Sequence, residues 1–503
     1  MTASLLCETV TGRSMAEIVA ARDAVARADM VELRLDGVAD IDVAGALHRR
    51  RLPAIVTCRA PWEGGRFDGS EEARARILSR AIDLGADFVD IEWRALTGSA
   101  GAAFESMVRR APQRILLSMH DFEGVPVDLA ATARAMRAIG AGVIKVAVSA
   151  AKLTDTLPLV DVARNGNAVV IGMGEAGVPS RLLATRYGSR WTYGGPALAP
   201  GQIPGERMLG EFRFRRVGAA TRIFAVVSTN AMYSLSPVMH NAAFYDAGLD
   251  AVYVPLPARD FDDFLAYAHA IGIEGASVTI PFKLDALAAA SEADERTRAV
   301  GAANTLRRLN RAGALGRPEG EWEATNTDID GFLAPLDAVF PRSLKGVHAS
   351  VLGAGGSARA VVVALASRGA RITVHARRRE QAMDVGGVTD AMIGAWPPAA
   401  GSWDLLVNCT PLGGPGLADE SPMPGGPFTG PVVYDLTYGP GTSRLLREAA
   451  GAGCVTLDGL PMLVAQAERQ FEWWTGQRPR PGVMADAARR RLADAETIVA
   501  KVH

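Results

Sequence analysis

Short apolar runs alternate with segments of helical period along roughly the first 210 residues. The runs predicted as strands are Leu5–Val10, Met30–Asp36, Ala54–Arg59, Phe88–Trp93, Ile115–His120, Val143–Val148, Ala168–Met173 and Trp191–Gly195. Most are continuously apolar, as parallel strands covered on both faces are. Eight such units predict an α/β fold of the (β/α)8 barrel type. A doubly wound sheet is the alternative, but it usually has fewer strands, and no Gly-rich phosphate loop follows the first run.

The pattern changes after residues 217–221 (VGAAT), which we interpret as a short linker. Residues from about 222 to 335 again alternate strands and helices. Residues from about 345 to 470 begin with a strand, a glycine turn, an Ala-rich helix and a second strand. We therefore expect a barrel over 1–216, an α/β domain over 222–335 completed by C-terminal helices at about 475–503, and a Rossmann-type domain over 345–470. The stretch between Leu306 and Trp322 is expected to be a hairpin tip, and residues 381–400 are left unassigned.

Composition excludes several classes of protein. Hydrophobic residues make up 49%, charged residues 22%, and the formal net charge is −1, so nothing favours a nucleic-acid or membrane-surface partner. Cys7, Cys58, Cys409 and Cys454 form no CxxC pair, which indicates free thiols in a reducing compartment. No apolar run reaches the length of a membrane span, and no targeting segment is recognised. We expect a cytoplasmic protein with small-molecule partners and no metal; the oligomeric state is left open.

Charged residues gather at the ends of the predicted barrel strands. They are Glu32, Arg34, Arg59, Glu92 and His120, with Lys145 inside the sixth strand. A barrel carries its active site at this face. Lys145 is flanked by Ile144 and Val146, and burial favours the neutral, nucleophilic form of an amine. A histidine that moves protons and arginines that hold a carboxylate complete a set suited to Schiff-base chemistry on a ketone-bearing anion.

The segment 1–215 resembles type I 3-dehydroquinate dehydratases. The matching motifs are ELR at 32–34, TCRAPWEGG at 57–65, DIE at 90–92, SMHDF at 118–122, IKVAV at 144–148, MGEAGVPSR at 173–181 and APGQ at 199–202. The resemblance implies that Lys145 forms an imine with the substrate ketone. It implies that His120 is the general acid and base, that Glu63 assists His120 or contacts substrate, and that Glu92 orients the imidazole.

The same resemblance implies a set of substrate-binding residues around the imine. The carboxylate and hydroxyls would be held by Arg59, Arg181, Glu32, Arg34 and Gln202. One departure is Leu198, where the family often has Ser or Thr four residues before the glutamine of PGQ.

A glycine-rich turn, GAGGSA at 353–358, follows a predicted strand and opens a predicted helix. Its glycines allow a tight turn and a close approach to a pyrophosphate at the helix N-terminus. The next strand ends in basic rather than acidic residues, Arg377, Arg378 and Arg379, which favours NADP over NAD. The predicted cofactor-binding residues are Gly353, Ala354, Gly355, Gly356, Ser357, Ala358, Arg377, Arg378, Asn408 and Thr410.

Hydroxyl, amide and charged residues recur between residues 230 and 330. Ser234 and Ser236 lie beside a proline turn, Lys283 follows a proline break, and Asn304, Asn326 and Asp328 lie in GAANT and TNTD. Such clusters suit a polyhydroxylated acid.

These segments resemble shikimate dehydrogenase, as do NCTPLGG at 408–414, YDLTYGPGT at 434–442 and GLPMLVAQA at 459–467. The resemblance implies that Lys283 and Asp328 form a catalytic pair, with Lys283 transferring the proton at the substrate oxygen. The implied substrate contacts are Ser234, Ser236, Thr279, Asn304, Tyr438 and Gln466. Ser277 and Gly414 depart from the common Asn and Met of the family.

The two resemblances fit together, because the product of the first reaction, 3-dehydroshikimate, is the substrate of the second. The domain order is that of the plant bifunctional enzymes. Two alternatives remain. One is a metabolite-sensing regulator without catalysis, disfavoured because Lys145, His120, Lys283 and Asp328 are all present. The other is a quinate-preferring dehydrogenase, disfavoured by the paired Ser234 and Ser236.

Overall fold

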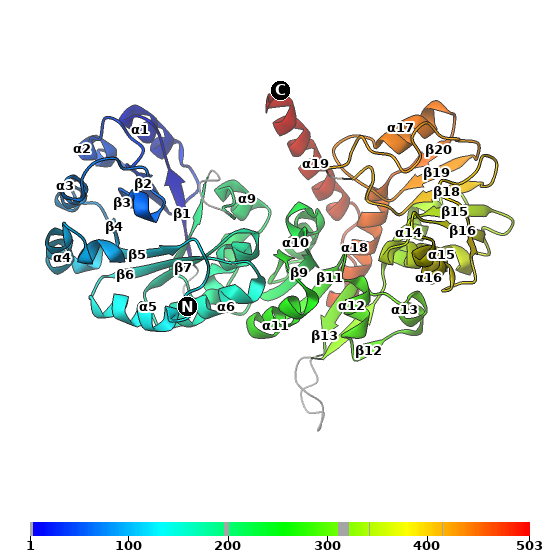
Figure 1. Cartoon of the computed structure of the whole chain (residues 1–503), viewed down its shortest axis with the longest axis horizontal. Helices are drawn as coiled ribbons and strands as arrows, with labels where there is room; N and C mark the ends of the chain where they lie inside the picture. The colour runs from blue at the N-terminus through cyan, green and yellow to red at the C-terminus, as the bar shows by residue number, and fades with distance from the viewer. Residues whose placement is uncertain (1–3, 196–200, 310–320, 342, 415, 503) are drawn as a thin grey trace, which may run out of the picture. The chain divides into compact units, whose positions relative to one another are not determined.

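The computed structural model describes residues 4–502 apart from 196–200, 310–320, 342 and 415 (Figure 1). It divides into two compact units. The first holds residues 1–221 and 254–271, and the second holds residues 222–253 and 272–503.

The first unit contains the predicted barrel. Eight strands form one sheet in the order β7-β6-β5-β4-β3-β2-β1-β8, and all their pairings are parallel. The strands are β1 (Leu5–Val10), β2 (Met30–Arg34), β3 (Ala54–Thr57), β4 (Phe88–Glu92), β5 (Ile115–Asp121), β6 (Val143–Ser149), β7 (Ala168–Met173) and β8 (Trp191–Gly194). The prediction of a (β/α)8 barrel is thus confirmed, with strand ends displaced by at most two residues.

Helices follow the strands around the outside of the sheet (Figure 1). They are α1 (Met15–Ala24), α2 (Val43–Leu47), α3 (Glu71–Asp83), α4 (Gly101–Arg110), α5 (Leu129–Ala138), α6 (Leu157–Arg164), α7 (Val178–Leu182), α8 (Ala184–Tyr187) and α9 (Gly205–Gly210). Ser14 and Ser70 cap α1 and α3 by accepting hydrogen bonds from backbone N–H groups of the first turn. Local sequence therefore defines where these helices begin.

The barrel closes between β7 and β8 through a few hydrogen bonds. The N–H of Arg190 donates to the carbonyl of Ala168 at 2.9 Å. The Ser189 hydroxyl accepts from the N–H of Val170 at 3.1 Å and donates to the carbonyl of Trp191 at 2.8 Å. A side chain thus bridges part of this seam and satisfies backbone groups that would otherwise be buried without partners.

Large side chains fill the barrel interior. A buried cluster includes Cys7, Ile55, Val169, Trp191 and Tyr193, and the rings of Phe88 and Trp191 pack with centroids 5.3 Å apart. The barrel is therefore a packed core with its polar groups toward the carboxyl ends of the strands.

The second unit contains two further sheets. One has the strand order β10-β9-β11-β13-β14-β12. Its strands are β9 (Arg222–Ser228), β10 (Ala251–Pro257), β11 (Ile273–Val278), β12 (Glu292–Ala293), β13 (Thr305–Arg308) and β14 (Trp322–Thr325). The first residues of β10, up to Tyr253, belong to the second unit, and the rest of β10 belongs to the first. Strands β13 and β14 are antiparallel. The hairpin tip predicted between them falls largely on residues 310–320, outside the described residues.

The other sheet is wholly parallel, in the order β17-β16-β15-β18-β19-β20. Its strands are β15 (His348–Leu352), β16 (Arg371–His375), β17 (Met392–Ile393), β18 (Leu405–Asn408), β19 (Val432–Asp435) and β20 (Val455–Leu457). In chain order this is 3-2-1-4-5-6, the doubly wound arrangement of dinucleotide-binding folds. The unassigned residues 381–400 contain the end of α16 (Arg379–Gly386) and β17.

Helices of six to twenty residues complete the second unit. They are α10 (Ser236–Asp246), α12 (Lys283–Ala288), α13 (Glu295–Val300), α14 (Asp328–Leu336), α15 (Gly356–Ser367), α17 (Arg444–Gly451), α18 (Gly459–Thr475) and α19 (Val483–Val502). Phe471 and Trp474 of α18 and Met484 of α19 enter one core with Phe224 of β9 and Phe244 of α10. The C-terminal helices therefore pack on the β9 sheet.

Candidate active sites

A pocket opens at the carboxyl ends of the barrel strands. It brings together side chains from at least five strands and the loops that follow them. Its lining is Thr9, Glu32, Arg34, Arg59, Glu63, Gly64, His120, Phe122, Lys145, Ala147, Ile171, Met173, Arg181, Tyr193 and Gln202. Of the barrel residues predicted to act, only Glu92 is missing from this lining.

Lys145 projects from the middle of β6 and is only 6% exposed. Its Nζ lies 3.5 Å from a carboxylate oxygen of Asp90 and 3.7 Å from one of Glu32. Both separations are longer than a charge-assisted hydrogen bond between an ammonium and a carboxylate, which is about 2.7–2.9 Å. The amine is thus held among charges without being clamped by one of them, so it remains available to a carbonyl carbon.

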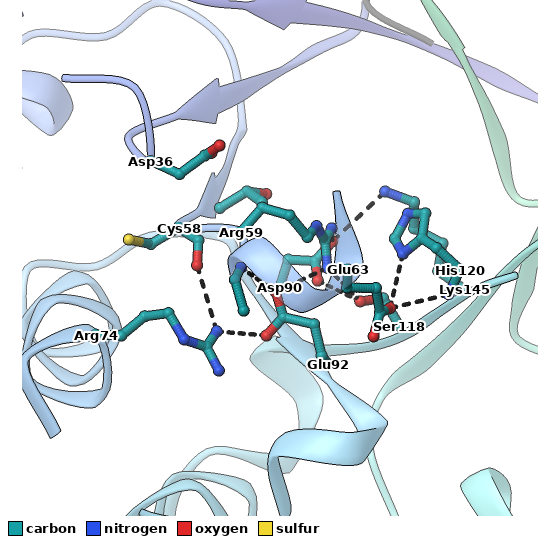
Figure 2. Close-up of polar contacts among 12 residues, drawn as sticks. Asp36, Cys58, Arg59, Glu63, Arg74, Asp90, Glu92, Ser118, His120 and Lys145 are labelled. Atoms are coloured by element: carbon teal, nitrogen blue, oxygen red, sulfur yellow. Dashed lines mark hydrogen bonds and ion pairs between the residues drawn. The ribbon is translucent and has the colours of Figure 1, made fainter. Parts of the chain in front are cut away.

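His120 is the penultimate residue of β5 and lies beside Glu63 of the 3-10 turn η1 (Pro61–Glu63) (Figure 2). Oε1 of Glu63 lies 2.9 Å from Nδ1 of the imidazole and accepts the backbone N–H of His120 at 2.9 Å. Burial holds the pKa of His120 well below its usual value, helped by the positive charges of Arg59 and Lys145. Burial raises the pKa of Glu63 to about 8. The ring is therefore oriented through Nδ1 and neutral at pH 7, which leaves Nε2 to exchange a proton.

Glu92 does not orient the imidazole, and this expectation is corrected. Its oxygens accept from the guanidinium of Arg59 at 3.0 Å, from the N–H of Ala60 at 3.2 Å and from Arg74 of α3 (Figure 2). The physical reason is its position as the last residue of β4, where the chain turns into the 3-10 helix η2 (Trp93–Thr97) and the side chain meets α3 at the rim.

Asp90 and Ser118 are functional candidates that the sequence analysis did not name. Asp90 accepts from Arg59 at 2.7 Å and from the Ser118 hydroxyl at 2.6 Å, and it is the closest carboxylate to Lys145. Arg59 holds the pKa of Asp90 below its usual value despite complete burial. The signal was present in the DIE motif, because Asp90 lies two residues before Glu92 and so on the same face of the strand.

The remaining predicted barrel residues differ in how they are paired. Arg34 forms two hydrogen bonds to Asp36, at 2.8 and 3.0 Å. Burial lowers the pKa of Arg181 to about 10, and its Nε has no hydrogen-bond partner among the described residues. Gln202 donates to the carbonyl of Gly194 at 3.1 Å. Arg181 is thus the guanidinium most ready to receive an anion, while Leu198 lies outside the described residues.

A second pocket lies within the second unit. It is lined by Val226, Ser234, Ser236, Ser277, Val278, Thr279, Lys283, Asn304, Asp328, Ser357, Leu436, Tyr438, Gly459, Met462, Leu463, Gln466 and Gln470. Every residue predicted to bind or transform the second substrate is in this set. Ser277 and Gln470 are added to it: the Ser277 hydroxyl donates to Gln470 at 2.6 Å and accepts from the Tyr253 hydroxyl at 2.6 Å.

Lys283 and Asp328 meet in this pocket. Lys283 begins α12 and Asp328 begins α14, and their Nζ and Oδ2 atoms are 2.6 Å apart. The other oxygen of Asp328 accepts from the amide of Asn304 at 2.8 Å. The same amide contacts Gln466 Oε1 at 3.3 Å. Both charged groups are buried, so the pair is held at one place by a network rather than being a mobile surface ion pair.

The glycine turn has the geometry that a dinucleotide requires. Gly353 has φ +106°, a conformation that strains residues with a side chain, and Gly355 is the N-cap of α15. A Cβ on Gly355 would meet nothing within 4 Å, so open space lies before the helix N-terminus. Ser357 accepts from the ammonium of Lys283 at 2.9 Å, which places the turn next to the Lys283–Asp328 pair.

The other predicted cofactor residues have different surroundings. Arg377 and Arg378 are exposed directly after β16. The amide of Asn408 donates to Asp435 at 2.9 Å and accepts from Thr410. Asn408 therefore shapes the loop after β18 instead of facing a ligand. Gly414 lies near Thr437, and a Cβ there would have its closest contact, 3.1 Å, with the carbonyl of Pro411.

Comparison with known proteins covers both units. The family model for type I 3-dehydroquinase matches residues 6–217. The models for the shikimate dehydrogenase substrate binding domain and the shikimate 5'-dehydrogenase C-terminal domain match residues 226–306 and 459–489.

Individual relatives match one half or nearly the whole chain. The shikimate dehydrogenase (NADP(+)) of Salinibacter ruber is 39% identical, over 54% of this chain and 98% of its own length. The shikimate 5-dehydrogenase of Thermus thermophilus, solved with NADP(H) and shikimate, is 33% identical over 54% of this chain and 99% of that chain, with a TM-score of 0.47. The bifunctional 3-dehydroquinate dehydratase/shikimate dehydrogenase of Arabidopsis thaliana, named as chloroplastic, is 30% identical over 94% of this chain and 82% of that protein. The chain therefore belongs to the family of bifunctional 3-dehydroquinate dehydratase/shikimate dehydrogenases.

Proposed function

We propose that this chain dehydrates 3-dehydroquinate to 3-dehydroshikimate in its barrel and reduces 3-dehydroshikimate to shikimate with NADPH in its second unit. The observation that carries the first step is Lys145, buried at the carboxyl ends of the barrel strands beside a neutral, oriented His120. The observation that carries the second is the buried Lys283–Asp328 pair next to a glycine turn that opens a helix.

In the barrel, the neutral amine of Lys145 attacks the substrate ketone. One proton is consumed, the carbonyl oxygen leaves as water, and a protonated imine remains. The positive charge draws electrons from the neighbouring C2–H bond, so Nε2 of His120 removes that proton and then protonates the departing C1 hydroxyl. Glu63 keeps the ring in place through Nδ1. The Nε of Arg181, which has no hydrogen-bond partner among the described residues, supports a role for this side chain in holding the substrate carboxylate.

In the second unit, Lys283 and Asp328 handle the proton of the reacting oxygen. Reduction of a ketone adds a hydride to carbon and a proton to oxygen, and a lysine held by a carboxylate can deliver that proton. Ser234, Ser236, Asn304 and Gln466 line the pocket with hydroxyl and amide groups that suit a polyhydroxylated acid.

NADP fits the residues present. The open space at Gly355 and the N-terminus of α15 suit a pyrophosphate, and Arg377 and Arg378 suit a 2′-phosphate. When bound, this group supplies the hydride chemistry. Several relatives are named as NADP(+)-dependent shikimate dehydrogenases, which supports the same choice here.

The two alternatives are less well supported by the geometry. A regulator without catalysis has no need for the complete, internally paired groups of both pockets. A quinate-preferring second unit is tested by comparing shikimate and quinate as substrates for oxidation; faster turnover of quinate would establish it.

The four cysteines are free thiols, which supports a reducing compartment such as the cytoplasm. No helix among the described residues is long and apolar enough to cross a membrane.

The imine is tested by chemical trapping. Borohydride added with dehydroquinate should reduce the imine and leave a covalent adduct on Lys145, with loss of dehydratase activity. The adduct is located by mass spectrometry of the digested protein, and Lys152, an ordinary lysine three residues beyond β6, serves as the control position. Full activity in Lys145→Ala, or a wild-type protein without adduct, contradicts imine catalysis.

A further inference from the structure

The face of an aromatic ring is one of the nearest partners of the Lys145 ammonium. Tyr193 lies on β8 and is 4% exposed, and its ring centroid lies 4.4 Å from Nζ of Lys145. A cation within about 6 Å of a ring centroid is attracted by the negative face of the ring, most strongly when both are desolvated. The carboxylates of Asp90 and Glu32, at 3.5 and 3.7 Å, are not close enough to satisfy the ammonium alone.

The importance of the ring increases when the imine forms. The neutral amine carries two hydrogens; with the ketone and one proton it yields water and a nitrogen that keeps one hydrogen and a full positive charge. The ammonium can donate three hydrogen bonds, but the protonated imine can donate only one. A single N–H cannot point at both carboxylates at once, whereas attraction to the ring face depends on charge and not on donors.

From this geometry, and resting on the imine role proposed for Lys145, we propose that Tyr193 stabilises the protonated imine through its ring face. The residue lines the same pocket as Lys145 and His120. Its contribution comes from the ring and not from the hydroxyl. Neither the Tyr193 hydroxyl nor the indole N–H of the nearby Trp191 has a partner at hydrogen-bond distance and angle among the described residues. Burial raises the pKa of this phenol well above its usual value, so it stays uncharged.

The surroundings of Tyr193 offer a matched control. Phe88 is another aromatic residue of the barrel interior, and it packs on Trp191 with centroids 5.3 Å apart. Phe88 does not line the pocket described above. Replacing Phe88 by Leu therefore removes a ring from the same core without removing a ring from beside Lys145.

The test compares three variants of the full chain, Tyr193→Phe, Tyr193→Leu and Phe88→Leu, with dehydroquinate as substrate. Tyr193→Leu should lower the dehydratase kcat and the rate of borohydride trapping by roughly ten- to thirtyfold, the effect of losing one desolvated cation–π contact. Tyr193→Phe should rescue most of both rates because the ring is restored. Phe88→Leu should leave both near wild type, and dehydroshikimate reduction should be unaffected in all three.

Two outcomes would overturn the proposal. One is equal kcat and trapping rates in Tyr193→Leu and Tyr193→Phe. The other is an equal loss in Tyr193→Leu and Phe88→Leu, which would assign the effect to core packing. If Tyr193→Leu does not fold, Tyr193→Met replaces it as a long apolar side chain without a ring. Failure of the imine itself is distinguishable, because wild type would then give no adduct on Lys145.

Discussion

Glu63 shows how strongly burial can change a single carboxyl group in this protein. Its side chain is buried between η1 and β5, close to Asp90 and Glu92, and its pKa is raised to about 8. The opposite case is Asp90, whose pKa is lowered because Arg59 contacts it directly. The pKa values of two neighbouring buried acids are thus shifted in opposite directions by their surroundings, upward by burial for Glu63 and downward by Arg59 for Asp90.

Glu63→Gln should change the pH dependence of folding stability. In the folded wild type Glu63 holds its proton up to about pH 8, whereas the unfolded group releases it near its ordinary value of 4.5. The folded state therefore binds more protons between these two pH values, and wild-type stability falls as pH rises through this window. Glutamine does not titrate, so the variant should gain stability relative to wild type between pH 5 and pH 8, with about 1.4 kcal/mol for each unit of pKa difference.

Denaturant unfolding followed at several pH values measures this difference. The comparison variant is Glu72→Gln, which removes an exposed carboxyl from α3, where no comparable increase between pH 5 and 8 is expected. A stability difference between Glu63→Gln and wild type that is the same at pH 5 and pH 8 would show that Glu63 ionises normally in the folded protein.

At the scale of elements, the carboxyl ends of parallel strands carry the chemistry of both units. In the barrel, β2, β5 and β6 each deliver charged groups to one pocket, and Arg59 reaches it from two residues beyond the end of β3. In the doubly wound sheet, β15 leads into the glycine turn and β16 leads to the arginines, two neighbouring strands that meet a dinucleotide at its phosphate and its ribose. We therefore expect the cofactor preference to depend on the short segment between β16 and α16.

Replacing Arg377 and Arg378 together by Ala should weaken the use of NADP selectively. Charge-assisted hydrogen bonds to a phosphate contribute on the order of 1.5–3 kcal/mol each, so the Michaelis constant for NADP should rise about ten- to a hundredfold or more. The constant for NAD, which lacks the 2′-phosphate, should change little. Both are measured from initial rates of shikimate oxidation, with Arg371→Ala at the exposed start of β16 as the control. An equal rise in the Michaelis constants for NADP and NAD would mean that these arginines only lie in a solvated turn and do not bind the 2′-phosphate.

At the scale of the whole molecule, each unit has its own core and its own pocket. The barrel pocket is built from residues of the first unit, and the second pocket is built from residues of the second. No residue is common to the two linings. The family to which the chain belongs joins two activities in one chain, yet each pocket lining falls within one unit.

The two activities should therefore be separable by single substitutions. Lys145→Ala should abolish dehydration and leave dehydroshikimate reduction within about twofold of wild type, because effects are expected to be independent at sites that share no residue. Lys283→Ala should do the reverse. Dehydration is followed by the absorbance of the enone product, and reduction by the loss of NADPH. Loss of both activities from either substitution would contradict independent sites.

The sequence by itself determined the elements, the fold class and most of the two residue sets. Continuous apolar runs identify buried parallel strands, and polar residues at their ends identify the catalytic face, because both features depend on local periodicity. Tertiary structure alone decided which groups meet. Asp90 and Glu92 share one face of β4, yet Asp90 reaches Lys145 while Glu92 turns to Arg59 and Arg74 at the rim. The contact between Tyr193 and Lys145 joins strands nearly fifty residues apart. Such pairings depend on the depth of each side chain in a closed barrel, which the order of residues along a strand does not contain.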